Sequence, residues 1–203
     1  MAQYFDNVEI ANAKIYDYEA VVLGKTYALQ GTDGTFSKDC LDDGTKLLLE
    51  TILQADLGVK ILDLGCGTGP LGLILSHADP KRIVTMSDVN VRALELAKKN
   101  AERLGVSDRV EIVESDVYHN LNSTYDTIVS NPPIRAGKAV TYAIYDGAPD
   151  HLNPNGRLIV VVRRKQGSDS VFSHLKEIFG NAEILASHKG YRVLIAMKKE
   201  LTK

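Results

Sequence analysis

The sequence contains few cysteines and no long apolar run, and these shortages exclude several classes of protein. Cys40 and Cys66 form no C-x-x-C pair and are too few for a disulfide scaffold, so a reducing cytoplasm is the expected location. No uninterrupted apolar stretch approaches the ~20 residues that cross a bilayer. The first residues, MAQYFDNVEI, carry acids and no apolar run, so we expect no signal peptide. The histidines show no metal-ligand spacing, and no bound metal is expected.

The composition is that of a globular protein whose charge is unevenly distributed. The chain has 203 residues, of which 44% are hydrophobic and 25% charged, enough for one large α/β domain or a domain with a short appendage. Residues 1–50 hold four basic against nine acidic side chains, whereas residues 157–203 hold ten against four. The basic C-terminal part is compatible with nucleic-acid binding, although solvated faces of opposite sign explain it more simply.

Strand and helix patterns alternate along most of the chain. β-rich runs around Gly24 and Lys25 predict an N-terminal hairpin, and LDDGTKLLLETILQ predicts a helix capped by Asp42 or Asp43. Strands are predicted over 59–65, 82–88, 109–116, 125–131 and 156–164, helices over 69–78, 90–105, 137–151 and 168–180, and a closing hairpin turns at Lys189-Gly190. We therefore expect an α/β, Rossmann-like fold with helices on both faces of a seven-stranded mixed sheet. The sheet is mostly parallel, with one antiparallel strand from the closing hairpin. The hairpin extension would cover 1–35 and the main domain 36–203.

A glycine-rich turn, DLGCGTGPLG, follows the first strand of this alternation. Ligands of such sheets lie beyond the C-terminal strand ends, where Gly65, Gly67 and Gly69 would present bare backbone N–H groups. The G-x-G-x-x-G spacing formally matches a dinucleotide site. Asp63, however, is unfavourable beside a pyrophosphate and favourable beside a cationic amine, which favours S-adenosylmethionine over NAD. A purely structural turn would not need three glycines behind an acid. Cys66 and Thr68, which lie between these glycines, are also predicted to bind the cofactor.

Two further strand ends carry acidic residues. Asp88, followed by Val89, lies 19 residues after Gly69, the distance at which an acid accepts hydrogen bonds from ribose hydroxyls. Asp116 could accept from an adenine amino group, while the amide of Val117 could donate to a ring nitrogen. The alternative for each acid is a helix cap. With Asp63 in place, the set favours a nucleoside-containing cofactor.

The segment SNPPIRAGK ends the fourth strand with two prolines, which cannot continue a hydrogen-bonded ladder. If the substrate is an exocyclic amine, two oxygen acceptors would draw its nitrogen toward tetrahedral geometry and stabilise the developing positive charge. Asn131 offers a side-chain carbonyl and Pro132 a main-chain carbonyl, whose direction Pro133 helps to fix. A rigid loop after a strand would explain the prolines but not the asparagine before them.

DLGCGTG, SDVN and SNPPIRAGK together resemble class I S-adenosylmethionine-dependent methyltransferases with an N-P-P motif. GTFSKDCLDDGTKLLLE and HKGYRVL narrow the likeness to the small-subunit (16S) rRNA guanine-N2 methyltransferases and their short single-domain relatives, over about residues 30–197. The resemblance implies that the glycine loop and Asp63 hold the methionine end, Asp88 the ribose, and Asp116 with Val117 the adenine. Asn131, Pro132 and Pro133 would form the catalytic motif. The residues expected to contact the substrate are Phe36, Ile134, Arg135, Lys138, Arg164 and Lys165.

Two departures from the family pattern stand out. Ile134 replaces the aromatic residue that many amino-methyltransferases carry after N-P-P, which makes adenine N6 of DNA a less favoured target. The second, degenerate N-terminal copy of the domain found in the long rRNA enzymes is absent from this chain.

The sequence predicts a cytoplasmic enzyme that methylates an exocyclic amine, preferably guanine N2 of small-subunit rRNA, with catalysis from positioning rather than acid–base groups. Its partner would be that RNA or an assembled subunit, and the protein would be a monomer or a homodimer. The alternatives are methylation of adenine, of tRNA guanine or of a protein glutamine, an NAD-binding oxidoreductase, and a cofactor-binding module without catalysis.

Overall fold

The computed structural model describes residues 14–33, 40–132 and 137–199, and it contains a two-stranded hairpin and a seven-stranded sheet. The hairpin pairs β1 (Ile15–Val22) with β2 (Lys25–Thr32). The sheet has the order β5-β4-β3-β6-β7-β9-β8. Its strands are β3 (Lys60–Leu64), β4 (Ile83–Asp88), β5 (Val110–Glu114), β6 (Tyr125–Ser130), β7 (Leu152–Arg163), β8 (Glu183–His188) and β9 (Tyr191–Met197).

The pairing of these strands confirms the predicted mixed sheet. β3, β4, β5, β6 and β7 pair in parallel, and only β9 runs antiparallel to its neighbours β7 and β8. The closing hairpin turns at Lys189-Gly190, as predicted. β7 begins at Leu152, four residues before its predicted start.

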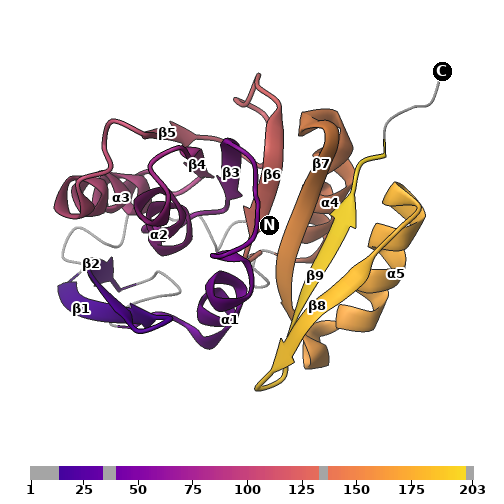
Figure 1. Ribbon diagram of the computed structural model, residues 1–203, viewed down its shortest axis with the longest axis horizontal. Coiled ribbons are helices and arrows are strands. Elements are labelled where there is room, and N and C mark those ends of the chain that lie inside the picture. The colour runs from indigo at the N-terminus through magenta and orange to yellow at the C-terminus, as the bar shows by residue number, and fades with distance from the viewer. Residues whose placement is uncertain (1–13, 34–39, 133–136, 200–203) are drawn as a thin grey trace.

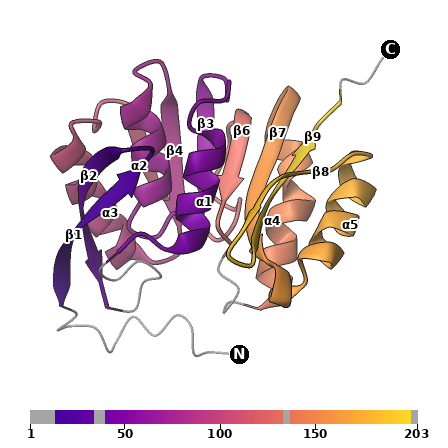
Figure 2. The same ribbon diagram turned by 60° about the horizontal axis from the view of Figure 1, so that its bottom comes forward.

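The α-helices of the described residues cover the two faces of the sheet (Figures 1 and 2). α1 (Asp43–Ile52), α2 (Pro70–Ala78) and α3 (Val91–Leu104) lie on one face, and α4 (Lys138–His151) and α5 (Ser168–Phe179) on the other. Side chains alternate along β7: Ile159 and Val161 enter the first core, and Leu158, Val160 and Val162 the second. β7 is therefore buried on both sides, which explains its continuous apolar run in the sequence.

The hairpin turns one residue earlier than predicted, at Leu23-Gly24, with φ angles of 48° and 77°. Two positive φ angles make a tight turn that suits the twist of paired strands. The inner face of the hairpin, which includes Tyr18 and Leu29, belongs to the same hydrophobic core as α1 and α2.

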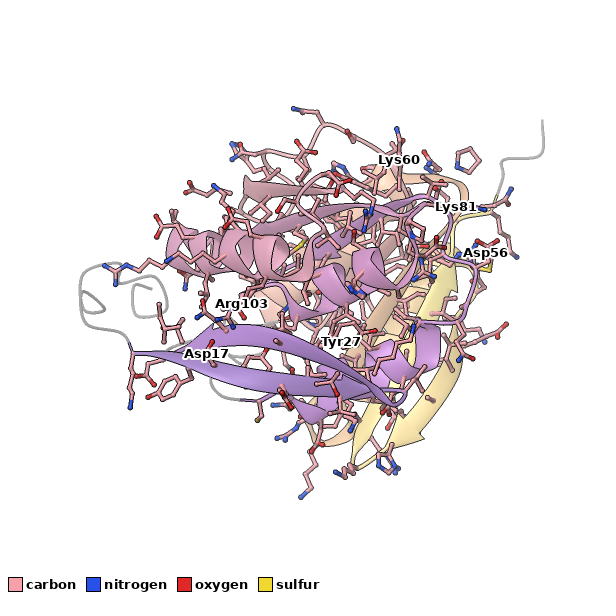
Figure 3. All side chains as sticks on the ribbon, turned by 60° about the vertical axis from the view of Figure 1, so that its left-hand side comes forward. Asp17, Tyr27, Asp56, Lys60, Lys81 and Arg103 are labelled. Atoms are coloured by element: carbon pink, nitrogen blue, oxygen red, sulfur yellow. The ribbon has the colours of Figure 1, made fainter. Side chains whose placement is uncertain are left out.

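Polar contacts also hold the hairpin to α3. Asp17 Oδ1 lies 2.6 Å from Arg103 Nη1, and the two side chains meet across the gap between hairpin and helix in Figure 3. The fully buried Asn100 accepts from the backbone N–H of Gln30 at 2.8 Å. Its amide donates to the carbonyls of Gln30 and Thr68 at 2.9 and 3.0 Å. The hairpin is thus linked through Asn100 to the glycine-rich loop.

Among the described helices, none is both long and apolar enough to cross a membrane. Within the same ranges, no three His, Cys, Asp or Glu side chains are grouped so that they could hold a metal ion.

Candidate functional site

Four adjacent parallel strands bring the predicted polar residues to one edge of the sheet. Asp63 is the second-last residue of β3, and Asp88 ends β4. Asp116 follows β5, and Asn131 follows β6. Because β5, β4, β3 and β6 are neighbours and point the same way, these positions share the C-terminal edge of the sheet.

The loop between β3 and α2 is held open by its glycines. Gly67 has a φ of 56°, and a Cβ there would meet nothing within 4 Å, so its backbone borders free space. Gly69 has a φ of 89°, and a Cβ there would lie 2.4 Å from the terminal methyl group of Met86. The first glycine therefore leaves the backbone bare, and the second also allows α2 to pack close to β4.

Asp63 is a buried carboxylate at the base of this loop, only 1% exposed. Its Oδ2 accepts the backbone N–H of Gly72 in the first turn of α2 at 2.8 Å. Burial raises the pKa of the Asp63 carboxyl from 3.8 to about 7; the hydrogen bond from Gly72 opposes this shift, and the negative charge of Asp88 adds to it. A cationic group bound beside Asp63 would offset the cost of its negative charge.

Asp88 anchors the loop rather than capping α3. Its Oδ2 accepts from Gly67 N–H at 2.8 Å and its Oδ1 from Asn90 N–H at 2.9 Å. The N-cap of α3 is Asn90, whose side chain accepts from Ala93 N–H. The helix-cap alternative for Asp88 is therefore wrong. Val89, half-buried, follows it in the same turn.

The turn after β5 holds Val117 in a rare conformation. Asp116 is exposed, and the described residues after it form a turn and not a helix, so the helix-cap alternative for Asp116 is also wrong. Val117 has a φ of 48°, which is a genuine outlier for a β-branched residue. Ser115 Oγ maintains the turn by donating to Val117 O at 2.9 Å and accepting from Asn120 N–H at 3.1 Å. Such strain concentrates at functional sites.

Cys66 has none of the features of a nucleophile. It is buried, and its burial together with the charges of Asp63 and Asp88 raises the pKa of its thiol well above the usual value. Its sulfur lies 3.5 Å from Gly67 O. The thiol therefore stays protonated, and Cys66 contributes only its backbone and bulk to the loop.

Asn131 contacts the first turn of α1, on the other side of the loop. Its Nδ2 donates to Asp42 Oδ1 at 3.1 Å and to Thr45 Oγ1 at 2.9 Å. Asp42, one of the two predicted caps of α1, is its N-cap and accepts from Gly44 N–H and Thr45 N–H, each at 3.0 Å. Asp42, Thr45 and Asn131 line a small cavity of about 60 Å³ together with Asp63, Gly65, Cys66, Gly67, Thr68, Pro70 and Leu71.

A larger cavity of about 450 Å³ lies on the other side of the N-P-P motif, and we call it the Pro132 cavity. Pro132, itself buried, forms part of its wall. The remaining lining residues are Lys138, Thr141, Tyr142, Tyr145, Val161, Val162, Lys165, Gln166, Gly167, Ser170 and Val171. Two of the predicted substrate contacts, Lys138 and Lys165, thus meet there. Arg164 is exposed and does not line it.

Four predicted residues lie outside the described ranges: Phe36, Pro133, Ile134 and Arg135. The sequence-based prediction also missed residues of the site. Asp42 was expected only as a helix cap, and Thr45, Tyr142 and Gln166 were not expected to contribute. The signal for Asp42 and Thr45 was the segment GTFSKDCLDDGTKLLLE, which resembles the corresponding segment of the 16S rRNA guanine-N2 methyltransferases. That resemblance did not assign a role to either residue.

Residues 26–195 match the model of the methyltransferase small domain family. The chain belongs to this family. The membership confirms the predicted class I methyltransferase with S-adenosylmethionine as its cofactor and decides against an NAD-dependent oxidoreductase.

Several known proteins resemble this methyltransferase over most of its length. It is 39% identical to the uncharacterized protein YbxB of Bacillus subtilis over 86% of this chain and 87% of that protein. It is 34% identical to ribosomal RNA small subunit methyltransferase C of Serratia proteamaculans over 79% of this chain and 46% of that protein. The 16S rRNA N2 methyltransferase (RsmC) of T. thermophilus, solved with AdoMet and guanosine, superposes with a TM-score of 0.80 at 29% identity. That match covers 91% of this chain and 51% of the other, so the chain spans about half the length of these rRNA methyltransferases.

The site fits S-adenosylmethionine in its chemistry. The bare backbone at Gly67 leaves room for a ligand, and the buried carboxylate of Asp63 is matched by an ammonium group. Each oxygen of the Asp88 carboxylate accepts one backbone N–H and keeps a further lone pair, so the carboxylate can also accept from ribose hydroxyls. No group of the loop would require a phosphate.

Proposed function

We propose that this methyltransferase modifies an exocyclic amine, guanine N2 of small-subunit (16S) rRNA, with Asn131 and Pro132 binding the amine. The observation that carries the proposal is the arrangement of Asn131. Its amide nitrogen donates to Asp42 and Thr45, so its carbonyl oxygen is the end left to accept hydrogen bonds from the N–H groups of a substrate amine. The bound cofactor supplies an electrophilic methyl group on its sulfonium. The residues of this chain supply position and hydrogen-bond acceptors.

In this proposal, residues at three strand ends bind different parts of the cofactor. Asp63, Gly65, Gly67 and Gly69, with Cys66 and Thr68, hold the methionine end; Asp88 and Val89 hold the ribose; Asp116 and the Val117 amide hold the adenine. The strained φ of Val117 supports its part, because it fixes the direction of that amide. Asn131 borders the small cavity beside the glycine-rich loop, and Pro132 borders the Pro132 cavity. The amine would therefore bind where these two cavities adjoin the motif.

The Pro132 cavity has the chemistry that a nucleotide needs. Tyr142 and the valines offer apolar surface to a base, and Gln166 and Ser170 offer polar groups to its edges. Lys138 and Lys165, both exposed, could meet the phosphates of the same strand. The rRNA methyltransferases among the relatives support RNA as the partner. We propose that the protein meets this RNA in the cytoplasm.

Lys138 and Lys165 should account for part of the salt dependence of RNA binding. We expect Lys138→Ala and Lys165→Ala each to weaken binding of unmodified small-subunit rRNA and to lower the slope of log affinity against log salt by about 1. Filter binding over a range of salt concentrations measures this slope. Lys176→Ala removes an exposed lysine of α5 that does not line the cavity, and it should leave the slope unchanged. An equal loss in all three variants would contradict the assignment.

Cofactor affinity should fall in acid because of Asp63. A cationic ligand binds the ionised carboxylate, whose pKa is about 7 in the free protein, so binding below that pH releases a proton. S-adenosylhomocysteine should bind about tenfold more weakly at about pH 6 than its limiting affinity at higher pH. Titration calorimetry at several pH values measures this dependence, and Asp63→Asn should abolish it. A wild-type affinity that is constant from about pH 5.5 to 7.5 would refute the role of Asp63.

A panel of methyl acceptors tests the proposed substrate. The protein is incubated with radiolabelled S-adenosylmethionine and, separately, with unmodified small-subunit rRNA, assembled small subunits, tRNA, duplex DNA and a glutamine-containing protein substrate. We expect label in small-subunit rRNA, naked or assembled, and not in the others. Label confined to tRNA, DNA or protein would overturn the proposed substrate while leaving the methyltransferase assignment intact.

A further inference from the structure

The N-cap of α1 and a residue of its first turn contact the side chain that is proposed to bind the methyl acceptor. Asn131 Nδ2 has two acceptors, Asp42 Oδ1 at 3.1 Å and Thr45 Oγ1 at 2.9 Å. Both contacts join segments more than 80 residues apart in the sequence, since 89 and 86 residues separate the partners. Thr45 is only 4% exposed, so water does not readily replace its hydroxyl. The nitrogen end of the Asn131 amide is therefore held by Asp42 and Thr45, and the carbonyl end is the one proposed to face the substrate amine.

We propose that Asp42 and Thr45 are positioning residues for Asn131: Asp42 fixes which end of the Asn131 amide faces the methyl acceptor, and Thr45 holds the amide in that place. This inference rests on the proposed function. An amide has a donor end and an acceptor end of nearly the same shape, and either could point toward the substrate. Only the carbonyl end can accept from the amine, whereas the reversed amide would set N–H groups against the amine hydrogens.

The chemistry of Asp42 excludes the reversed amide. A carboxylate only accepts, so a carbonyl oxygen of Asn131 beside Asp42 Oδ1 would bring two acceptors together. The carboxylate cannot turn away without cost, because the same Oδ1 accepts the backbone N–H groups of Gly44 and Thr45 as the N-cap of α1. The cap and the clamp thus share one oxygen atom.

α1 can hold Asn131 in place because its first turn is packed against the sheet. A Cβ on Gly44 would lie 2.9 Å from Cε1 of Tyr191, so the helix backbone lies directly on that ring. The Tyr191 hydroxyl accepts from Arg163 Nε at 2.8 Å, and Lys189 Nζ lies 3.2 Å from Asp43 Oδ1. One turn further on, Leu48 and Leu49 are fully buried in the first core. The clamp therefore stands on rigid elements.

The sharpest variant is Thr45→Val, which keeps the shape of the side chain and removes the acceptor. We expect it to lower kcat for rRNA methylation, measured at saturating cofactor, about tenfold, and we expect Thr45→Ser to keep the wild-type kcat. Asp42→Ser keeps a good N-cap but does not reach Asn131, and it should lose activity to a similar degree. Asp42→Asn keeps the same acceptor oxygen and should retain most of it.

A double-mutant cycle separates positioning from simple damage to the fold. If Thr45 acts through Asn131, Thr45→Val should cause no further loss in an Asn131→Ala background. An unchanged kcat in the single variant, or the same tenfold loss in both backgrounds, would overturn the inference. If the wild-type protein methylates no rRNA while it binds the cofactor, the proposed function fails instead.

A second readout needs no methyl acceptor. The side-chain amide of Asn131 gives two N–H signals in a ¹⁵N-correlated NMR spectrum, which are assigned by their absence in Asn131→Ala. They should shift in Thr45→Val and in Asp42→Ser and return to their wild-type positions in Thr45→Ser. Signals that stay in place in both damaging variants would overturn the inference whatever the substrate is.

Discussion

Asn131→Ala should lower kcat for methyl transfer by about 10²–10³-fold, the cost of removing one preorganised acceptor from a transition state. The loss is large because the hydrogen bond strengthens as positive charge develops on the amine nitrogen. Cofactor affinity should change by no more than about threefold, because most of the cofactor contacts that we propose come from other residues. Single-turnover kinetics with saturating cofactor, beside calorimetry with S-adenosylhomocysteine, measures both quantities.

Asn153→Ala is the matched control for this variant. Asn153 also uses its side chain to join two segments, donating to Asp126 Oδ1 at 2.7 Å and accepting from Thr124, but it lies near the start of β7 at the opposite edge of the sheet. It should affect stability and spare kcat. If Asn131→Ala keeps more than about a third of the wild-type kcat, the amine does not bind at this residue.

Asp63→Asn should stabilise the protein at pH 8 and weaken cofactor binding by about 10–100-fold. The folded pKa of Asp63, about 7, lies above its ordinary value of 3.8, so the folded state holds this proton more tightly than the unfolded chain does. Stability is therefore lost as the pH rises from about 4 to 7, by on the order of 2–4 kcal/mol. Asparagine never ionises, and its oxygen can still accept from Gly72 N–H. It cannot offset the charge of an ammonium group.

Denaturant unfolding at about pH 4, 6 and 8 tests the stability half of this prediction. The gain in the free energy of unfolding should be largest at pH 8 and vanish near pH 4. Asp126→Asn serves as a control of opposite sign. The pKa of Asp126 is lowered because hydrogen bonds from Lys60, Asn153 and Val59 outweigh its partial burial, so that variant should lose stability at pH 8. If Asp63→Asn lowers the free energy of unfolding at pH 8, the negative charge of Asp63 does not destabilise the folded protein.

Local patterns were enough to predict the fold. Several of its elements end at residues whose effect is visible in the sequence, as Gly105 ends α3 with a φ of 66°. The hairpin turn was misplaced by one residue because Leu23 adopts a positive φ that its side chain does not favour, and nothing in its identity announces this. The early start of β7 was missed because Pro154 and Asn155 are typical of a loop.

The candidate site was predictable where chemistry lies at a strand end and obscure where it depends on tertiary contact. Asp63, Asp88 and Asn131 could be found because parallel strands end at a common edge. The cap at Asp42 was also predictable, but its contact with Asn131 joins segments 89 residues apart, which no local pattern encodes. The Pro132 cavity likewise arises from the packing of α4, β7 and α5 and has no signature in any one of them.

The identity of the modified nucleoside tests most directly whether Asn131 and Pro132 direct a methyl group to guanine N2. Unmodified small-subunit rRNA is labelled by the wild-type protein and by Asn131→Ala, digested to nucleosides and analysed by chromatography and mass spectrometry. We expect N2-methylguanosine as the labelled product of the wild-type protein and a near absence of label with the variant. Label in N6-methyladenosine or in a ring-methylated nucleoside, or undiminished label with Asn131→Ala, would contradict this proposal.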